Sequence, residues 1–345
     1  MSYDANKHLT DFHNERVFVD DESLQTARDR RDANRNRLER GLTANGDPQP
    51  EKFVQQGSYA MRTMVQSEVD TSDIDDGAVF ARSSLKGPRE GDKTANEAKE
   101  MVCKALSVSG KFNTPPEVRK NCVRVYYNDG FHVDIPVYRT FEEDGKTKKE
   151  LASAGTWKTS APEDITNWFN DSVTSKSPDE TNGRQLRRIV RLLKYWSKSR
   201  SSWAMPSGFI ISVLVNEAFP YQGKLNRDDQ ALLAVMRSIR NRLLFQEKVY
   251  RPVDPQEEIT TEQTLSRVRK MREELKGAID ELSKIDRSDC DELMALKALK
   301  SVFYTDYWDK RIKELEDDSG SGSSSKQRAA PMLAVDKRGG TGQYA

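Results

Sequence analysis

Cysteine and histidine are scarce in this chain of 345 residues. The three cysteines are far apart in the sequence: Cys103, Cys122 and Cys290. They form no C-x-x-C pair, so neither a disulfide framework nor a zinc knuckle is indicated. The three histidines are His8, His13 and His132. A histidine-based metal site or a Ser-His-Asp triad therefore has almost no material.

Long apolar runs are absent as well. No stretch approaches the ~20 apolar residues of a membrane-spanning helix, and the N-terminus lacks the apolar segment of a signal peptide. We therefore expect a cytoplasmic protein without a membrane partner. The 56 basic residues nearly balance the 55 acidic ones, giving a net charge of +1. This balance argues against bulk attraction to nucleic acid, although local basic stretches can still bind phosphate.

Three aspartates are the most informative residues that the chain does contain. Asp73 and Asp75 begin the run Asp-Ile-Asp-Asp-Gly, and Asp134 lies in His-Val-Asp-Ile-Pro-Val. Upstream, a strand-like segment over 53–56 ends at Gly57-Ser58. Residues two apart on a strand share a face, with Cα atoms roughly 7 Å apart. If the two strands are neighbours, all three carboxylates converge above one face of a sheet.

The clearest strand pattern surrounds the third aspartate. Apolar and polar residues alternate over 123–127 and again over 131–137, and Asn-Asp-Gly at 128–130 is typical of a turn. The pattern predicts a hairpin with one buried face. Asp134 lies between Val133 and Ile135, so it points to the face opposite the apolar set.

The chemistry of these residues points to a metal-dependent nucleotidyltransferase. An Asp-x-Asp pair alone is a weak signal, since such pairs are common at strand ends, and Asp75-Asp76-Gly77 also fits a simple turn. Three acids held close together repel one another, and a bound cation removes that repulsion. Magnesium prefers oxygen ligands, usually a few carboxylates plus substrate phosphates. The interpretation requires Asp134 to lie near the pair and not to be buried against an arginine.

The remaining pattern predicts a sheet-containing half followed by a helical half. Helices are expected at 20–41, 58–66 and 95–107, and a strand at 73–80. Further helices are expected at 182–199, 208–219, 228–245, 260–285 and 289–315. From Asp318 the composition becomes rich in Ser and Gly, which predicts a disordered tail. We therefore expect a core over 1–160, a helical lobe over 161–317 and a tail over 318–345.

Several possible phosphate ligands each have an ordinary structural alternative. Gly57-Ser58 offers a backbone N–H at a helix start or is a plain strand-to-helix turn with a serine cap. Ser207 either caps the next helix or contacts phosphate. A basic stripe on the 182–199 helix either holds triphosphates or faces solvent: Arg187, Arg191, Lys194 and Lys198. Lys194 is the preferred ligand of the four, and we expect His132 to pack on its strand rather than bind metal.

These segments together resemble the cGAS/DncV-like nucleotidyltransferases (CD-NTases) of bacterial anti-phage (CBASS) systems. The resemblance is carried by Gln-Gly-Ser-Tyr at 56–59, Asp-Ile-Asp-Asp-Gly at 73–77 and His-Val-Asp-Ile-Pro-Val-Tyr at 132–138. It continues through Trp-Phe-Asn-Asp-Ser at 168–172, Leu-Leu-Lys-Tyr-Trp at 192–196 and Pro-Ser at 206–207, and covers roughly residues 10–315. It implies an α+β fold: a polymerase-β-like core of mixed sheet and helices, an oligoadenylate-synthase-like helical lobe, and a cleft between them.

The resemblance also implies residue roles. Two Mg²⁺ ions, which Mn²⁺ can replace, would be bound by Asp73 and Asp75, with Asp134 completing the site. The donor nucleotide would be contacted by Gln56, Gly57, Ser58, Lys194, Ser207 and Asp254.

The product implied by the resemblance is a cyclic di- or trinucleotide. It would be made from ATP, and from GTP or a pyrimidine NTP where a second substrate is used. It would activate a separate effector protein in anti-phage defence. The zinc-binding His/Cys insertion of the animal DNA sensor is absent, so direct sensing of double-stranded DNA is not expected. The tail ending at Ala345 resembles those that E1/E2-like enzymes conjugate to other proteins; the alternative is an ordinary disordered end.

Two rival functions remain open at this point. The first is a linear nucleotidyltransferase that acts on RNA, protein or a small molecule. The second is a catalytically inactive module that only binds nucleotides, although retention of all three acids argues against it.

Overall fold

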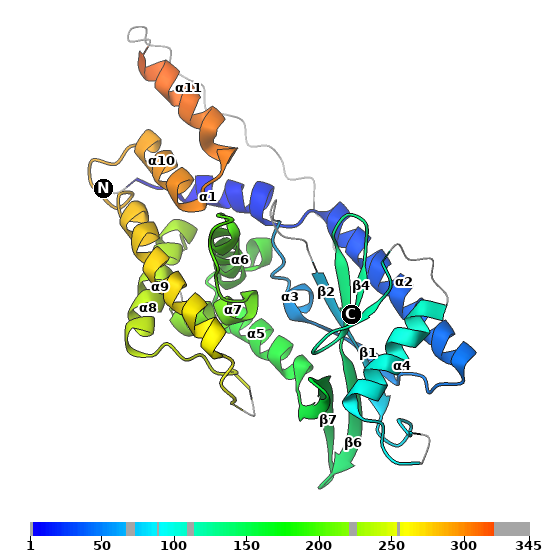
Figure 1. Ribbon diagram of the computed structural model, residues 1–345. Helices are drawn as coiled ribbons and strands as arrows, with labels where there is room; N and C mark the ends of the chain where they lie inside the picture. The colour runs from blue at the N-terminus through cyan, green and yellow to red at the C-terminus, as the bar shows by residue number, and fades with distance from the viewer. Residues whose placement is uncertain are drawn as a thin grey trace.

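The computed structural model describes residues 3–66, 73–87, 90–108, 114–220, 226–253 and 256–320. The fold is α+β, with a sheet-containing core beside a helical lobe (Figure 1). Asp254 lies outside the described residues, and so does most of the predicted tail. The predicted start of that tail at Asp318 is too early, because the last helix, α11, spans Asp309–Gly320. No helix among the described residues is long and apolar enough to cross a membrane.

The strand β2 (Asp73–Ala81) is the centre of the mixed sheet. It pairs antiparallel with β1 (Lys52–Gln56) and parallel with both β5 (His132–Ile135) and β6 (Val137–Glu143). Asp75 pairs with both β1 and β5, so these strands lie along opposite edges of β2. β5 and β6 share one register along β2, so both lie on the edge opposite β1; the sheet continues from β5 to β4 and β3, and from β6 to β7 and β8. The outer strands are β3 (Glu117–Val118), β4 (Val123–Tyr126), β7 (Lys146–Ser153) and β8 (Thr156–Thr159).

The predicted hairpin around the third aspartate is present as β4 and β5, paired antiparallel. The predicted second strand over 131–137 is divided at Pro136, which has no N–H to donate to a sheet ladder. After this break β6 continues along β2, with Val137 opposite Ala78. The break leaves Asp134 on the segment that pairs with the acidic end of β2.

Two helices cover one face of the sheet, α2 (Asp21–Asn45) and α4 (Ala95–Val108) (Figure 1). Their apolar side chains, such as Leu38 and Val102, form a core with Phe80 and Val133. Val133 belongs to the alternating apolar set of the hairpin, so that set faces this core. Asp134, together with Asp73 and Asp75 at the start of β2, therefore lies on the opposite face of the sheet. This face is turned towards the helical lobe.

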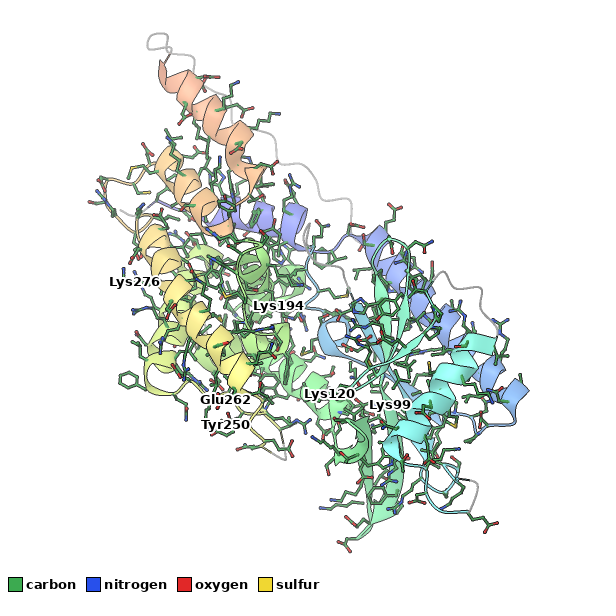
Figure 2. All side chains as sticks on the ribbon, viewed as in Figure 1. Lys99, Lys120, Lys194, Tyr250, Glu262 and Lys276 are labelled. Atoms are coloured by element: carbon green, nitrogen blue, oxygen red, sulfur yellow. The ribbon has the colours of Figure 1, made fainter. Side chains whose placement is uncertain are left out.

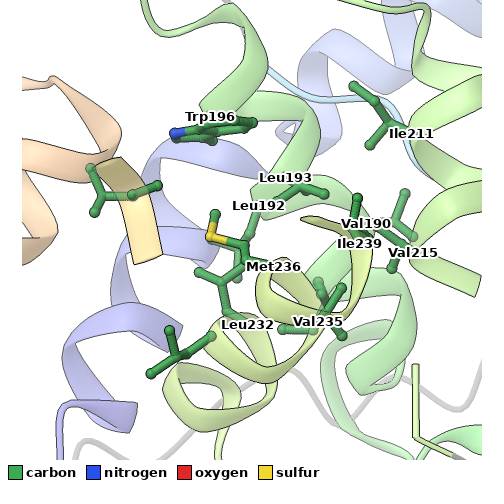
Figure 3. Packing of buried hydrophobic residues seen from close by; sticks show 14 of the residues in the cluster. Val190, Leu192, Leu193, Trp196, Ile211, Val215, Leu232, Val235, Met236 and Ile239 are labelled. Atoms are coloured by element: carbon green, nitrogen blue, oxygen red, sulfur yellow. The ribbon is translucent and has the colours of Figure 1, made fainter. Parts of the chain in front are cut away.

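The helical lobe is built around α6 (Gln185–Lys198). Its other helices are α5 (Pro162–Lys176), α7 (Gly208–Ala218), α8 (Asp228–Phe245), α9 (Glu262–Leu282), α10 (Glu292–Phe303) and α11, with short turns η2 (Thr181–Gly183) and η3 (Asp306–Trp308). Figure 3 shows Leu192, Leu193 and Trp196 of α6 packing beside Leu232 and Met236 of α8. This core fixes α6, whose opposite side faces the sheet.

The N-terminal segment packs on the helical lobe, although the sequence analysis grouped it with the core. It comprises α1 (Asn6–Phe12) and η1 (His13–Val17). Leu9 and Phe12 are fully buried in the same cluster as Trp196. Phe12 packs against four aromatic rings: Tyr195, Phe303, Tyr307 and Trp308. Apolar side chains from opposite ends of the chain thus complete the core of this lobe.

The helix predicted over 58–66 is wrong. Only a short helical turn, α3 (Gly57–Ala60), follows β1, and its N-cap is Gln56 rather than Ser58. Residues beyond Met61 leave the helix because Arg62 has a φ of +54°, in the left-handed region. The contacts that hold this extended segment come from the helical lobe and are described below.

Candidate active site

The sheet register brings the acidic residues of β2 and β5 together on one face. Asp73 pairs with His132, and Asp75 pairs with Asp134, in the parallel β2–β5 ladder. Side chains at register partners in adjacent strands lie next to each other on the same face. The convergence that the spacing predicted therefore follows directly from this register.

A group of possible metal ligands lies at this edge. Asp73, His132 and Asp134 each offer a ligand atom, and these atoms all lie within 4.8 Å of one another. The Nε2 atom of His132 is 3.8 Å from Oδ2 of Asp73. Oxygen and imidazole donors at this spacing fit a divalent cation. His132 had been expected to pack or hydrogen-bond on its strand rather than bind metal; the structure places it in this group, which does not include Asp75.

Asp75 packs against the Gly57 turn. A Cβ atom at Gly57 would lie 2.2 Å from Oδ2 of Asp75, and the φ of Gly57 is +66°. Only glycine fits this position, since both the space and the backbone conformation exclude a side chain. Burial, followed by the nearby charges of Asp73 and Asp134, raises the pKa of Asp75 to about 7. The carboxylates of Asp73 and Asp134 thus disfavour the charged form of Asp75. A cation bound between them would relieve this repulsion.

Asp134 is buried and forms a two-point ion pair with Arg124 of β4. The Nε and Nη2 atoms of Arg124 donate to the two carboxylate oxygens at 2.7 and 2.8 Å. The enzymatic interpretation required that Asp134 not be buried against an arginine, and this ion pair contradicts that requirement. The ion pair does not separate Asp134 from the cluster, because a carboxylate oxygen of Asp134 still lies within 4.8 Å of the ligand atoms of Asp73 and His132. A carboxylate has about four lone-pair positions, and Arg124 uses two of them.

Arg124 was missed in the sequence analysis, although the signal was present. A hairpin whose turn centres on Asp129 places residue 124 opposite residue 134, and the structure has this register.

Asp76, the third acid of the β2 run, points the other way. It is buried under α2, where Arg35 donates two hydrogen bonds of 2.6 Å to it. Asp76 is thus a structural residue beside two that face the site.

The predicted nucleotide ligands of β1 and its turn lie next to Asp75. Gln56 is the register partner of Asp75, and its Oε1 accepts a hydrogen bond of 2.7 Å from the hydroxyl of Tyr138. Gly57 and Ser58 follow directly. All three line one cavity, which is described below.

Three members of the basic stripe on α6 are buried, namely Arg187, Arg191 and Lys194, so the solvent-facing alternative does not hold for them. Arg187 donates to the carbonyl of Met61 at 3.0 Å. Arg191 donates twice to the carbonyl of Arg62, at 3.0 and 2.6 Å. Burial and neighbouring cations lower the pKa of Arg187 to about 10 and that of Arg191 to about 9.

Lys194 lies on the side of the helical lobe that faces the sheet (Figure 2). Its Nζ donates to the hydroxyl of Thr63 at 2.7 Å and to the Thr63 carbonyl at 3.2 Å. The Cα of Gly208 packs against its side chain, since a Cβ there would lie 3.0 Å from Cε of Lys194. Burial above all lowers the pKa of Lys194 to about 7. An anion beside this ammonium would favour its charged form.

A cavity of about 970 Å³ lies between the acidic edge of the sheet and the helical lobe. Asp73 and Asp75 line one side, whereas the lobe contributes cations, among them Lys194, Arg200 and Arg251. Ser207 also lines it while capping α7, where its side chain accepts from the N–H of Ile210. A cavity with acids on one wall and cations on the other suits a polyanion that carries metal ions.

An acidic sheet edge opposite a cationic lobe defines the class of protein, a nucleotidyltransferase. Residues 51–138 match the family described as "Cyclic GMP-AMP synthase DncV-like, nucleotidyltransferase domain". This match spans β1, the Gly-Ser turn, β2 and the hairpin that carries Asp134. The matched residues include the Gln-Gly-Ser-Tyr, Asp-Ile-Asp-Asp-Gly and His-Val-Asp-Ile-Pro-Val-Tyr motifs that carried the resemblance to this family.

Solved structures share this fold over most of the chain. The di-nucleotide cyclase DncV of Vibrio cholerae, in complex with GTP, is 15% identical with a TM-score of 0.68, over 88% of this chain and 96% of that one. The CD-NTase CdnG of Bradyrhizobium diazoefficiens, bound to GTP, is 16% identical with a TM-score of 0.68, over 91% and 100%. CdnC of E. coli MS115-1 with ATP is 15% identical with a TM-score of 0.63, over 88% and 98%.

Proposed function

We propose that the protein is a cyclic oligonucleotide synthase that makes a cyclic di- or trinucleotide from ATP, alone or with a second NTP, as a signal in anti-phage defence. The observation that carries this proposal is the cavity between the two lobes. It joins the acidic edge of β2 and β5 to a wall of cations that includes the buried Lys194, within a fold shared with the V. cholerae di-nucleotide cyclase. Its volume is near the upper end of the range of about 300–1,000 Å³ for ligand sites.

The residues at the two walls would divide the work. Asp73, Asp75 and Asp134 would hold magnesium, since carboxylate oxygens are the donors it prefers. When bound, two such ions supply charge neutralisation at the attacking and leaving oxygens. Lys194 would leave Thr63 for the phosphates, and the N–H groups of the Gly57-Ser58 turn would face the same group.

The remaining residues would orient the nucleotide. Gln56 and Ser58 line the cavity beside Asp75, and Ser207 lines it at the start of α7. The α7 helix would add its N-terminal dipole to the attraction for phosphate. Asp134 would also accept the proton of the attacking hydroxyl.

Product analysis tests this function directly. The purified protein is incubated with ATP, GTP, CTP and UTP in the presence of Mg²⁺, and the products are treated with phosphatase and identified by mass spectrometry. A phosphatase-resistant oligonucleotide without free phosphate ends is the expected result. A linear product, or nucleotide transferred to RNA or protein, would assign the site to linear transfer instead. The absence of any nucleotide product or binding would overturn the proposal.

A further inference from the structure

Residues 61–66, which follow the Gly57-Ser58 turn, run along the helical lobe rather than the sheet. Met61 and Val65 pack in the apolar cluster of that lobe. Val65 forms an antiparallel bridge with Phe18, and the N–H of Gln66 donates to the carbonyl of Val17 at 3.0 Å. The turn that faces Asp75 is thus continuous with a segment anchored on the other lobe.

Three side chains of α6 bind three successive residues of this segment. Arg187 donates to the carbonyl of Met61, Arg191 to that of Arg62, and Lys194 to Thr63. We call Arg187 and Arg191 the carbonyl clamp. Arg187 is further fixed by Asn170, whose Oδ1 accepts from it at 2.9 Å, and the Arg191 guanidinium lies 4.7 Å from the ring centre of Phe18. Contacts outside the 61–63 segment therefore also fix the side chains of both clamp residues.

The clamp is costly to the folded protein. Arg187 is 9% exposed and Arg191 is 4% exposed. Within the part of the chain that the structure describes, neither forms an ion pair with a carboxylate. A buried charge without a counter-charge is unfavourable even when its hydrogen bonds are made. We infer that these two arginines fix the position of residues 61–63 more than they stabilise the fold.

The clamp is connected to the turn through backbone hydrogen bonds. The N–H of Thr63 donates to the carbonyl of Ser58 at 2.7 Å, and that of Met61 donates to Gly57 at 3.2 Å. Between them Arg62 has a φ of +54°, a conformation that non-glycine residues adopt only when their surroundings hold it. Arg191 donates two hydrogen bonds to the carbonyl of Arg62, so it holds this residue in the left-handed conformation.

We propose that Arg187 and Arg191 are positioning residues, which hold the 61–63 segment and through it the Gly57-Ser58 turn in the conformation that receives the nucleotide. The inference rests on the proposed function for the identity of the ligand as a nucleoside triphosphate. The turn is kept in place by the opposite lobe before the nucleotide arrives. Loss of the clamp lowers the fraction of protein that is competent to bind, which weakens apparent affinity in the same proportion.

Arg191→Gln and Arg187→Gln test the inference in the full chain. Hydrogen exchange of residues 57–66 is followed by mass spectrometry without nucleotide, and exchange is expected to accelerate by about tenfold or more. With Mg²⁺ and a fluorescent ATP analogue, the Kd is expected to rise about tenfold. KM should rise by a similar factor while kcat changes by less than about threefold, because bound nucleotide restores the competent state.

A matched control is Lys176→Met. Lys176 lies on α5 in the same lobe, and its Nζ donates to the carbonyl of Asn216 at 2.7 Å and to its Oδ1 at 2.8 Å. It binds a carbonyl in the same manner but does not touch residues 57–66, so exchange there and nucleotide affinity should not change. Arg191→Lys, which keeps the charge with fewer donors, should fall between Arg191→Gln and wild type. It carries the same test if Arg191→Gln fails to fold.

Unchanged exchange over 57–66 in the clamp variants would overturn the inference. A fall in kcat that follows lost thermal stability, with KM unchanged, would overturn it as well, because that is the signature of a structural role only. The exchange measurement needs no nucleotide, so it tests the clamp independently of the product. A wild-type protein that neither binds ATP nor makes product would refute the proposed function while leaving the exchange result standing.

Discussion

Asp75 is the residue at which the electrostatics of the site are most unfavourable. It is packed on Gly57, next to two other carboxylates, and its pKa is raised to about 7. In the unfolded chain an aspartate titrates near 3.9. The folded state therefore holds this proton more tightly, so the stability linked to it is fully present below pH 4 and is lost as the pH rises through 7. A cation would replace the lost proton.

Asp75→Asn should separate activity from folding. The amide cannot ionise, so at pH 8 the variant without metal should melt at a higher temperature than wild type, and the gain should shrink towards pH 5. Turnover should fall by at least about a hundredfold, since one of the carboxylates proposed to hold the metal is gone. Asp73→Ala should be similarly inactive and folded. Melting curves at the two pH values and product assays check both; a variant that unfolds at pH 8 would indicate a structural role.

The lowered pKa of Lys194 predicts that nucleotide binding depends on pH. Unlike Asp75, Lys194 is charged when it is protonated, and the charged form is the one that attracts phosphate. Its pKa of about 7 in the free protein must rise when phosphates approach, so binding takes up a proton. Between pH 7.5 and 9 the Kd for Mg-ATP should therefore increase, by up to about tenfold per pH unit. Phosphate groups are already fully ionised in this range.

Lys194→Arg gives the control for this pH dependence. The guanidinium stays charged throughout the range, so the Kd of this variant should be flat while that of the wild type rises. Calorimetric titrations at three pH values measure both proteins. Parallel curves for wild type and Lys194→Arg would mean that Lys194 does not bind the phosphates.

At the scale of elements, one ion pair ties the helix α2 to the strand that carries the site. Arg35 of α2 holds both oxygens of Asp76, which is 2% exposed, and its guanidinium also lies 4.9 Å from the ring centre of Phe53. Removing the arginine leaves a buried carboxylate without a partner. Arg35→Met should therefore lower the free energy of unfolding by about 3 kcal/mol.

Denaturant unfolding measures this loss, and Asp76→Asn in the Arg35→Met background should recover part of it because the unpaired charge is removed. The exposed pair between Lys276 and Asp280 on α9 provides the comparison. Lys276→Ala should cost less than about 0.5 kcal/mol. Equal losses for the two single substitutions would show that Asp76 is not held as the structure indicates.

Local patterns predicted the elements that depend on local physics. The alternation and the Asn-Asp-Gly turn were sufficient for the hairpin, and Asp-x-Asp spacing was sufficient to place Asp73 and Asp75 on one face. The helix predicted over 58–66 failed because the conformation of this segment is set by contacts with α6, 126 to 129 residues further along the chain. The burial of Arg187 and Arg191 was missed for the same reason: a basic stripe has the same spacing whether it faces solvent or another segment.

At the scale of the whole molecule, the two cores draw on different parts of the chain. The sheet and its covering helices share one apolar cluster, and the helical lobe shares another. Segments 3–17 and 61–65 both cross to the helical lobe, so the boundary near residue 160 does not describe how the side chains pack. Sequence reasoning placed that boundary from changes in composition along the chain, which carry no information about such crossings.

Phe12→Ala and Phe80→Ala should distinguish the two cores. Both phenylalanines are fully buried, Phe12 in the helical lobe and Phe80 under the sheet, and each truncation should cost about 3–5 kcal/mol. In Phe12→Ala, hydrogen exchange should accelerate in α6 and α10, with little change in β2. In Phe80→Ala it should accelerate in β2, α2 and α4. Because α6 carries the clamp and Phe12 packs against Tyr195 of α6, Phe12→Ala should also loosen residues 61–63. Faster exchange in β2 and slow exchange in α6 after Phe12→Ala would instead assign the N-terminal segment to the sheet core.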